Sequence, residues 1–168
     1  MLMLSTTSFA LLLGLLGHPE APRQVAPTAG TPQTFRLPGG LRLTVRGHAA
    51  VITNAKGTVL ARNNRLIQRA DDHTDCPAEG FQTVVVKGNF FTIEQQNCGG
   101  WLFINEYFTF RYEPATGAIR LHKFGQTFTD RREPDKEMPD KILTEKDFGR
   151  RSFAQLNPAD LYALPAPK

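Results

Sequence analysis

The segment Leu102–Tyr112 shows the strictest alternation of residue types in the chain, and it limits what the chain can fold into. One parity is apolar and the other is mixed: Leu102, Ile104, Phe108, Phe110 and Tyr112 against Phe103, Asn105, Tyr107, Thr109 and Arg111. Because side chains alternate between the two faces of a strand, this pattern predicts a strand with one core face. At helical spacing the same residues scatter around the axis, which disfavours a helix.

Phe81–Thr129 continues this pattern as four runs rich in β-branched and aromatic residues. Turn signals separate the runs at Gly88-Asn89, Gly99-Gly100 and Pro114–Gly117. A change of apolar parity around Gly125 predicts a β-bulge in the last run. We therefore predict an antiparallel meander as the centre of the fold.

A second, less apolar β region precedes the meander, with short strands expected at about 34–37, 41–46, 49–53 and 58–62, and a further one considered at 65–68. It is expected to pack as a partner layer and not as a separate domain. The sequence thus predicts a single all-β domain over residues 34–164, blade-like or sandwich-like, with its core meander at 81–129.

The first 17 residues are typical of a secretory signal peptide. Phe9–Leu16 is an apolar run too short to span a bilayer, which needs about 20 residues. The alternative is a buried apolar segment at the N-terminus. Residues 18–33 are rich in Pro, Ala and Thr and are expected to form a flexible linker. The predicted location is periplasmic or secreted, with no membrane span after removal of the signal.

The chain has two cysteines, Cys76 and Cys98, and an exported chain with an even number of cysteines favours a disulfide. The alternatives are two free thiols or half of a zinc site, but there is no CxxC and no nearby pair of histidines.

Charge and motif content argue against several functional classes. The formal net charge of +4 is spread along the chain, which gives little support to nucleic-acid binding. No nucleophile elbow, P-loop or dinucleotide fingerprint occurs, so we expect no cofactor, and no convincing catalytic set is apparent.

Glu94 and Glu106 are the candidate catalytic residues. Glu106 has the parity of the apolar face, where an unpaired carboxylate is costly, and Glu94 lies one predicted strand earlier. Two carboxylates at a suitable separation can cleave a glycosidic bond. The alternative is ordinary cross-strand pairing with Arg111, Arg120 or Lys123.

Two other groups have open interpretations. Asp71, Asp72 and Asp75 could bind calcium, but their spacing does not match an EF-hand loop, and a solvated acidic loop is the simpler interpretation. Three aromatic residues share one face and form either a binding surface or, as we favour, a second core face under the N-terminal layer: Trp101, Phe103 and Tyr107.

The C-terminal third contains a mixed-charge loop at 130–147, in which Thr144–Asp147 loosely fits a capping box and predicts a helical turn. Five apolar or aromatic residues are expected to hold the C-terminal segment against the sheet: Phe148, Phe153, Leu156, Leu161 and Tyr162.

Three segments within residues 81–153 carry a family resemblance: VVVKGNFFTIEQQNCGGW, EYFTFRYEPATGAIRLHKFG and TEKDFGRRSF. These segments resemble a poorly characterised family of exported bacterial β-proteins. Their C-terminal modules carry a similar pattern of FTIEQ, GGW, TFRY, LHK.G and KDFG. Some longer relatives resemble periplasmic β-propellers, and one is associated with inhibiting a peptidoglycan-hydrolysing effector as an immunity protein. This chain has too few strands to close a typical propeller.

Three functional hypotheses follow. The favoured one is a non-enzymatic exported protein that binds another protein of the cell envelope, with inhibition of a cell-wall hydrolase as its specific form. The others are a glycan hydrolase using Glu94 and Glu106, and a calcium-stabilised structural module using the Asp71–Asp75 loop.

Overall fold

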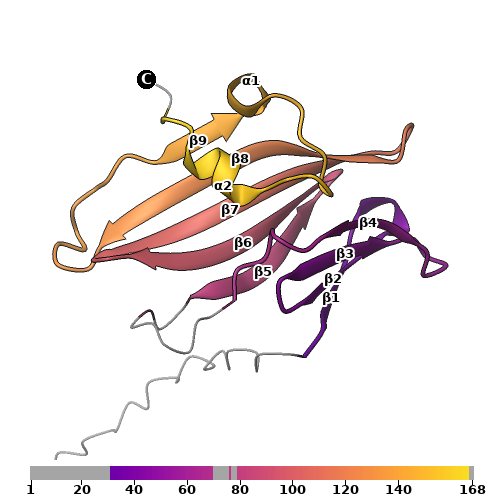
Figure 1. The fold of residues 1–168 in the computed structure, drawn as a ribbon, viewed down its shortest axis with the longest axis horizontal. Coiled ribbons are helices and arrows are strands. Elements are labelled where there is room, and N and C mark those ends of the chain that lie inside the picture. The colour runs from indigo at the N-terminus through magenta and orange to yellow at the C-terminus, as the bar shows by residue number, and fades with distance from the viewer. Residues whose placement is uncertain (1–30, 70–75, 77–78, 167–168) are drawn as a thin grey trace, which may run out of the picture.

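The computed structural model describes residues 31–69, 76 and 79–166. The predicted signal peptide and most of the predicted linker lie outside these residues, as do Asp71, Asp72 and Asp75. The described chain forms two antiparallel sheets that share one hydrophobic core, which confirms the all-β prediction (Figure 1).

The first sheet has four strands in the order β1-β2-β3-β4. A short 3₁₀ turn, η1 (Pro38–Gly40), connects the first two. The strands are β1 (Gln33–Arg36), β2 (Arg42–Arg46), β3 (Ala49–Thr53) and β4 (Val59–Asn63). These bounds agree closely with the four predicted strands, whereas residues 65–68, considered as a further strand, lie outside every strand.

The second sheet has five strands in the order β5-β6-β7-β8-β9, all antiparallel. The strands are β5 (Gly80–Lys87), β6 (Phe90–Gly99), β7 (Leu102–Glu113), β8 (Ala118–Asp130) and β9 (Lys141–Thr144). The first four are the predicted meander, and the turns after β5, β6 and β7 each contain a glycine with positive φ: Gly88, Gly100 and Gly117.

The predicted bulge exists, but three residues earlier than expected. Lys123 pairs with Thr109 and Leu121 with Phe110, so that His122 is the extra residue of β8. The parity change seen in the sequence near Gly125 is the consequence of this bulge.

β9 is the strand that the sequence did not predict, because four residues inside a charged loop carry little periodicity. It leads directly into α1 (Glu145–Phe148), whose start is the predicted capping box: the Thr144 backbone N–H donates to Asp147 Oδ2 at 2.7 Å. The chain ends with the short helix α2 (Pro158–Tyr162).

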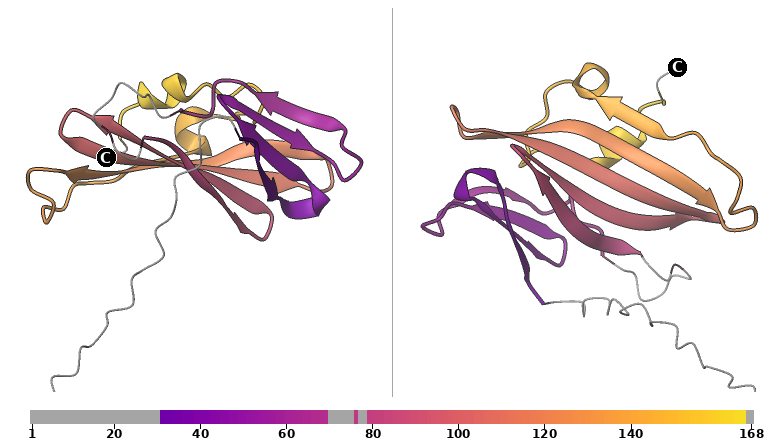
Figure 2. Two further views of the ribbon diagram at one scale, coloured as in Figure 1. Left: turned by 90° about the horizontal axis from the view of Figure 1, so that it is seen from below. Right: turned by 180° about the vertical axis from the view of Figure 1, so that it is seen from behind.

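The core lies on one side of the five-stranded sheet. The first sheet and the C-terminal segment cover that side, and the other described elements leave its opposite side uncovered (Figure 2). The prediction for β7 is confirmed at its centre, where Phe108 and Phe110 are fully buried. Four of the five expected C-terminal contacts are buried: Phe148, Phe153, Leu156 and Leu161.

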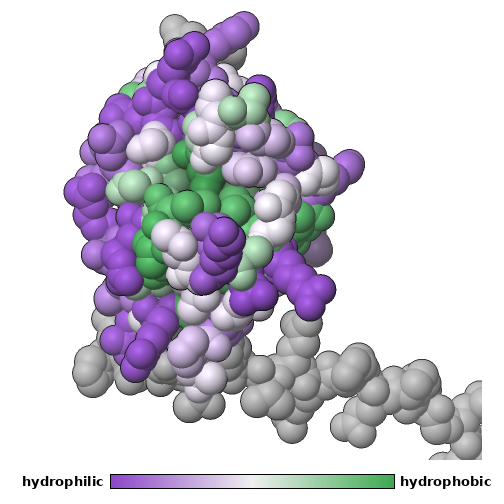
Figure 3. Space-filling model, turned by 90° about the vertical axis from the view of Figure 1, so that its right-hand side faces the viewer, coloured by the Kyte–Doolittle hydropathy of each residue, from purple (hydrophilic) through white to green (hydrophobic). Residues whose placement is uncertain are grey.

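At one end of the molecule the two sheets leave apolar side chains exposed, and polar side chains surround this apolar area (Figure 3). The exposed large apolar residues of β4 and β5 are Val59, Leu60, Val85 and Val86.

Candidate functional site

Four polar residues form a row across the core side of the five-stranded sheet. The register places Gln95 of β6 beside Glu106 of β7, Glu106 beside Gln126 of β8, and Gln126 beside Lys141 of β9. All four have the parity of their strands' buried apolar residues. We call this line of one carboxyl, two amides and one amine the polar row.

Glu106 is the centre of the polar row, and its side chain is fully buried. Its Oε1 accepts a hydrogen bond from Gln126 Nε2 at 2.9 Å, and its Oε2 accepts one from the Tyr162 hydroxyl at 2.8 Å. Burial raises the pKa of Glu106 above its ordinary value, although these hydrogen bonds, another with Asn97 and the charge of Lys141 oppose the increase. The carboxyl group is therefore well partnered but removed from water.

Helix α2 contacts the polar row in two ways. Its Tyr162 hydroxyl binds Glu106, and two of its backbone carbonyls bind Lys141 of β9. Lys141 Nζ donates hydrogen bonds to the carbonyl oxygens of Leu161 and Tyr162, both at 3.1 Å. Burial lowers the pKa of Lys141, and the nearby Glu106 carboxyl opposes this effect. The pKa of Tyr162 is raised, first by burial and then by Glu106, so its hydroxyl remains a hydrogen-bond donor.

The other end of the row binds the segment that follows the first sheet. Gln95 Nε2 donates to the Leu66 carbonyl at 3.0 Å, and Gln95 Oε1 accepts from the Gln68 backbone N–H at 2.7 Å. One amide thus satisfies two backbone groups of a segment that lies outside every strand, beside the backbone bond from Phe81 N–H to the Gln68 carbonyl at 3.1 Å.

Asn63 performs the same function between β4 and the C-terminal segment. Its Nδ2 donates to the carbonyls of Phe153 and Leu156 at 2.8 Å each. Its Oδ1 accepts from the backbone N–H groups of Arg65 and Leu66 at 2.8 and 3.0 Å. Buried amides therefore join both sheets and the C-terminal segment.

The structure does not bring the two candidate catalytic carboxyls together. Glu94 pairs with Tyr107, which faces the other side of the sheet from Glu106. Carboxyls on opposite faces of a sheet cannot flank one glycosidic bond. The alternative prediction, that Glu106 pairs across strands with Arg111, Arg120 or Lys123, is also wrong. Its carboxyl group instead accepts hydrogen bonds from the Gln126 amide and the Tyr162 hydroxyl.

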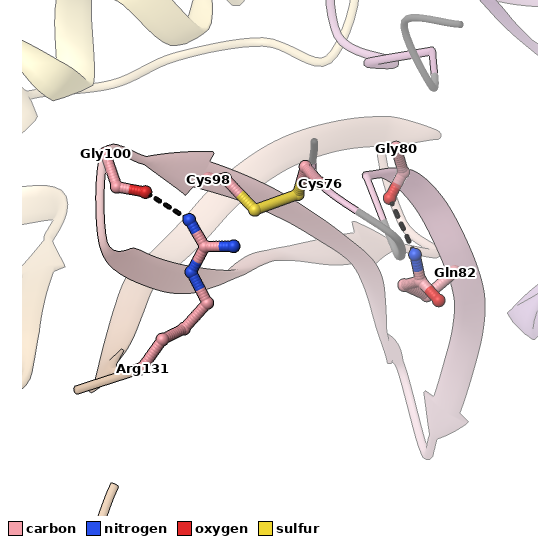
Figure 4. Close-up of a disulfide and its surroundings, with 6 residues drawn as sticks. All are labelled: Cys76, Gly80, Gln82, Cys98, Gly100 and Arg131. Atoms are coloured by element: carbon pink, nitrogen blue, oxygen red, sulfur yellow. Dashed lines mark hydrogen bonds between the residues drawn. A yellow bond between two sulfur atoms is a disulfide. The ribbon is translucent and has the colours of Figure 1, made fainter. Parts of the chain in front are cut away.

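The predicted disulfide is present, with Sγ atoms of Cys76 and Cys98 2.08 Å apart (Figure 4). It fixes the end of β6 immediately before the turn to β7. A disulfide is compatible with an oxidising, extracytoplasmic compartment.

Trp101 lies in this turn and is 58% exposed. The guanidinium of Arg131 lies 5.5 Å from the centre of the Trp101 ring and 5.2 Å from that of Phe103, and the guanidinium of Arg132 lies 5.9 Å from Trp101. We call Trp101, Phe103, Arg131 and Arg132 the turn cluster.

Several contacts hold the turn cluster in place. The Arg131 backbone N–H donates to the Trp101 carbonyl at 2.9 Å, and its guanidinium donates to the Gly100 carbonyl (Figure 4). Asp130 accepts hydrogen bonds from Arg132 Nε and Nη2 at 3.1 and 2.8 Å, and these bonds lower the pKa of Asp130 to about 2. These contacts fix the backbone of the turn and the two arginines beside the exposed indole.

Phe103 and Tyr107 lie on the uncovered side of the sheet, which we call the open face. It comprises the side chains of β5–β9 directed away from the core. Tyr107 lies over Gly125, since a Cβ at that glycine would be 3.8 Å from Tyr107. Thr92 and Thr109 share a hydrogen bond at 3.0 Å beside it.

The favoured interpretation of the three aromatic residues as a second core face is therefore wrong. None of Trp101, Phe103 and Tyr107 belongs to the core cluster, and the N-terminal layer packs on the opposite side of the sheet. Their parity was predicted correctly, but the choice of the covered face was not.

Sequence reasoning also missed most of the polar row. Gln95 and Gln126 carry a usable signal, since each shares the parity of buried apolar neighbours in its strand. Nothing in the sequence connects Tyr162 or Lys141 with Glu106. Within the residues that the structure describes, no three His, Cys, Asp or Glu side chains gather as a metal site.

Comparison with protein families, curated proteins and solved structures finds no match to this chain. The resemblance to exported bacterial β-proteins stays a prediction. Among the described helices, none combines the length and apolar character needed to cross a bilayer.

Proposed function

We propose that this chain is an exported, non-enzymatic protein that binds another protein of the cell envelope, and that it inhibits a cell-wall hydrolase. The turn cluster carries the proposal. Trp, Tyr and Arg are enriched at the energetic centres of protein interfaces, and here the guanidinium groups of two arginines lie within 6 Å of an exposed Trp ring.

The rigidity of the turn cluster supports a role in binding. The disulfide holds the preceding strand end, and Asp130 holds Arg132. A side chain that is already ordered before binding loses less conformational entropy on association. Stability alone does not require an exposed indole, because burying this ring would stabilise the fold more than exposing it.

A periplasmic or secreted location rests on the predicted signal peptide and on the Cys76–Cys98 pair. The non-enzymatic character rests on the position of Glu106, which is fully buried and separated from Glu94 by the sheet. The inhibitory role rests on the resemblance of residues 81–153 to the exported family.

The experiment measures clearance of a peptidoglycan suspension by periplasmic extract with and without the purified protein. The wild-type protein should slow clearance, and Trp101→Ala should raise the concentration for half inhibition at least about tenfold, as expected for loss of an interface centre. Val59→Ala, on an exposed residue of β4, serves as the matched control and should behave like the wild type. Unchanged clearance across extracts from several growth conditions would refute the inhibitory role.

A further inference from the structure

We propose that the open face docks an acidic protein surface, and that Lys87, Arg111 and Lys123 are the cations that recognise it. This inference rests on the proposed function, since it names the chemistry of the partner. The three residues come from β5, β7 and β8, and all three are exposed.

The register brings these cations to one end of the open face. Lys87 pairs with Phe90, and Phe90 pairs with Arg111, so the two cations lie two strands apart, about 10 Å at the usual strand spacing. Lys123 pairs with Thr109, two residues before Arg111 on the same strand. The bulge at His122 turns a further exposed side chain to this end, where its ring lies 4.9 Å from that of Phe90.

The positive charge of these three side chains is not neutralised within the described part of the protein. None of its ion pairs involves Lys87, Arg111 or Lys123. Arg120, which lies opposite Arg111 on β8, differs from these three residues because it forms an ion pair with Glu113 at 3.5 Å. Cations without internal partners are available for long-range attraction of an acidic surface.

The composition of the open face favours a protein over a nucleic acid. It presents the half-buried rings of Phe90, Tyr107 and Phe103 and the hydroxyls of Thr92 and Thr109 beside the cations. It also carries the carboxylate of Glu94, so its charge is mixed. Aromatic residues are enriched at protein interfaces, which are bordered by a polar rim, whereas nucleic-acid sites carry dense positive charge.

A second copy of this chain is a poor occupant, because two open faces packed together would place these cations near one another. The turn cluster lies at the far end of the same face: Phe103 belongs to both, and Arg131 lies over its ring. The docking surface thus combines an aromatic anchor at one end with cations at the other.

The test compares two triple variants that each remove three positive charges from the formal net charge of +4. The first is Lys87→Gln/Arg111→Gln/Lys123→Gln. The matched control is Arg42→Gln/Arg46→Gln/Arg62→Gln, at exposed arginines of β2 and β4. Each is measured in the clearance assay and for binding of labelled polyglutamate, phosphatidylglycerol vesicles and a DNA oligonucleotide.

We expect half inhibition by the open-face variant to require about tenfold more protein, and its affinity for polyglutamate to be about tenfold lower. Added salt should weaken the binding of polyglutamate by the wild type. The control variant should change either value less than threefold. Equal losses in the two variants would overturn the inference, because they would show attraction by overall charge. Two other results would also overturn it. One is that binding to vesicles or DNA depends on the three cations while binding to polyglutamate does not. The other is that the wild type is a dimer and these substitutions change its oligomeric state.

The two proposals fail differently. Inhibition that Trp101→Ala abolishes but the open-face variant retains would overturn the acidic docking surface and leave the proposed function standing. Absence of inhibition by the wild type, with polyglutamate binding that depends on Lys87, Arg111 and Lys123, would remove the inhibitory role and leave the charged docking surface.

Discussion

The hydroxyl of Tyr162 donates a hydrogen bond to the buried carboxyl of Glu106 at 2.8 Å, across 56 residues of sequence. This contact links helix α2 to the middle of the five-stranded sheet. The polar row beneath it places an ionisable group at a fully buried position, so the stability of the fold should respond to pH there.

Glu106→Gln should remove a pH dependence of stability. Because the folded-state pKa of Glu106 is raised, its contribution is fully present below the unfolded value near 4.5 and is lost as pH rises through the folded pKa. At about pH 8 the variant should melt about 2–4 °C higher than the wild type, equivalent to about 1 kcal/mol for a chain of this length. Near pH 4 the two melting temperatures should coincide, and a lower melting temperature of the variant at both pH values would contradict this account.

Tyr162→Phe should destabilise the protein by about 1–3 kcal/mol at neutral pH, because the buried Glu106 carboxylate loses one of its donors. The measurement is urea unfolding. In the Glu106→Gln background the same substitution should cost less, and a double-mutant cycle with no coupling energy would show that the contact is energetically silent.

Asn63→Leu should destabilise by about 3 kcal/mol or more, because it leaves two carbonyls and two backbone N–H groups without their partner in the core. Asn54→Ala is the matched control. Its Oδ1 also accepts two backbone N–H groups, but in an exposed turn where water can replace it. Urea unfolding should separate the two variants clearly, and similar losses would mean that the buried position of Asn63 does not matter.

Gly39→Ala should destabilise more than Gly40→Ala. Both glycines have positive φ, 69° and 73°, so each alanine meets a backbone penalty of about 1–2 kcal/mol. A Cβ at Gly39 would also collide with the ring of Tyr112, whereas one at Gly40 meets no atom within 4 Å. Thermal melts of the pair isolate the steric part, and equal melting temperatures would show that the Tyr112 ring moves aside freely.

Reduction of the disulfide between Cys76 and Cys98 should cost about 3 kcal/mol, the loop-closure value for a separation of 22 residues. Fluorescence of Trp101, the single tryptophan of the chain, should change at the same time, since Cys98 is the second-last residue of β6, just before the turn that holds Trp101. The double variant Cys76→Ser/Cys98→Ser should reproduce the reduced protein. A fluorescence spectrum unaffected by reduction would show that the disulfide does not order the turn cluster.

The sequence by itself determined the strands β1 to β8 and much of their order. The alternation of Leu102–Tyr112 defines which side chains of β7 share a face, and the glycine turns separate its neighbours. The cysteine pair and the apolar residues from Phe148 to Leu161 were also recognisable, as was the polar misfit of Glu106 on an apolar parity. These features are local, because periodicity and turn chemistry depend on residues close together in the chain.

Only the tertiary structure decided which face of the sheet is covered and what Glu106 contacts. Alternation distinguishes two faces of β7 but does not say which of two half-apolar faces receives the first sheet, so Trp101 and Tyr107 were assigned to the core in error. The partners of Glu106 come from β8 and α2, and their contact depends on the docking of the whole C-terminal segment. Such contacts result from packing between distant segments, for which a single sequence carries no local signal.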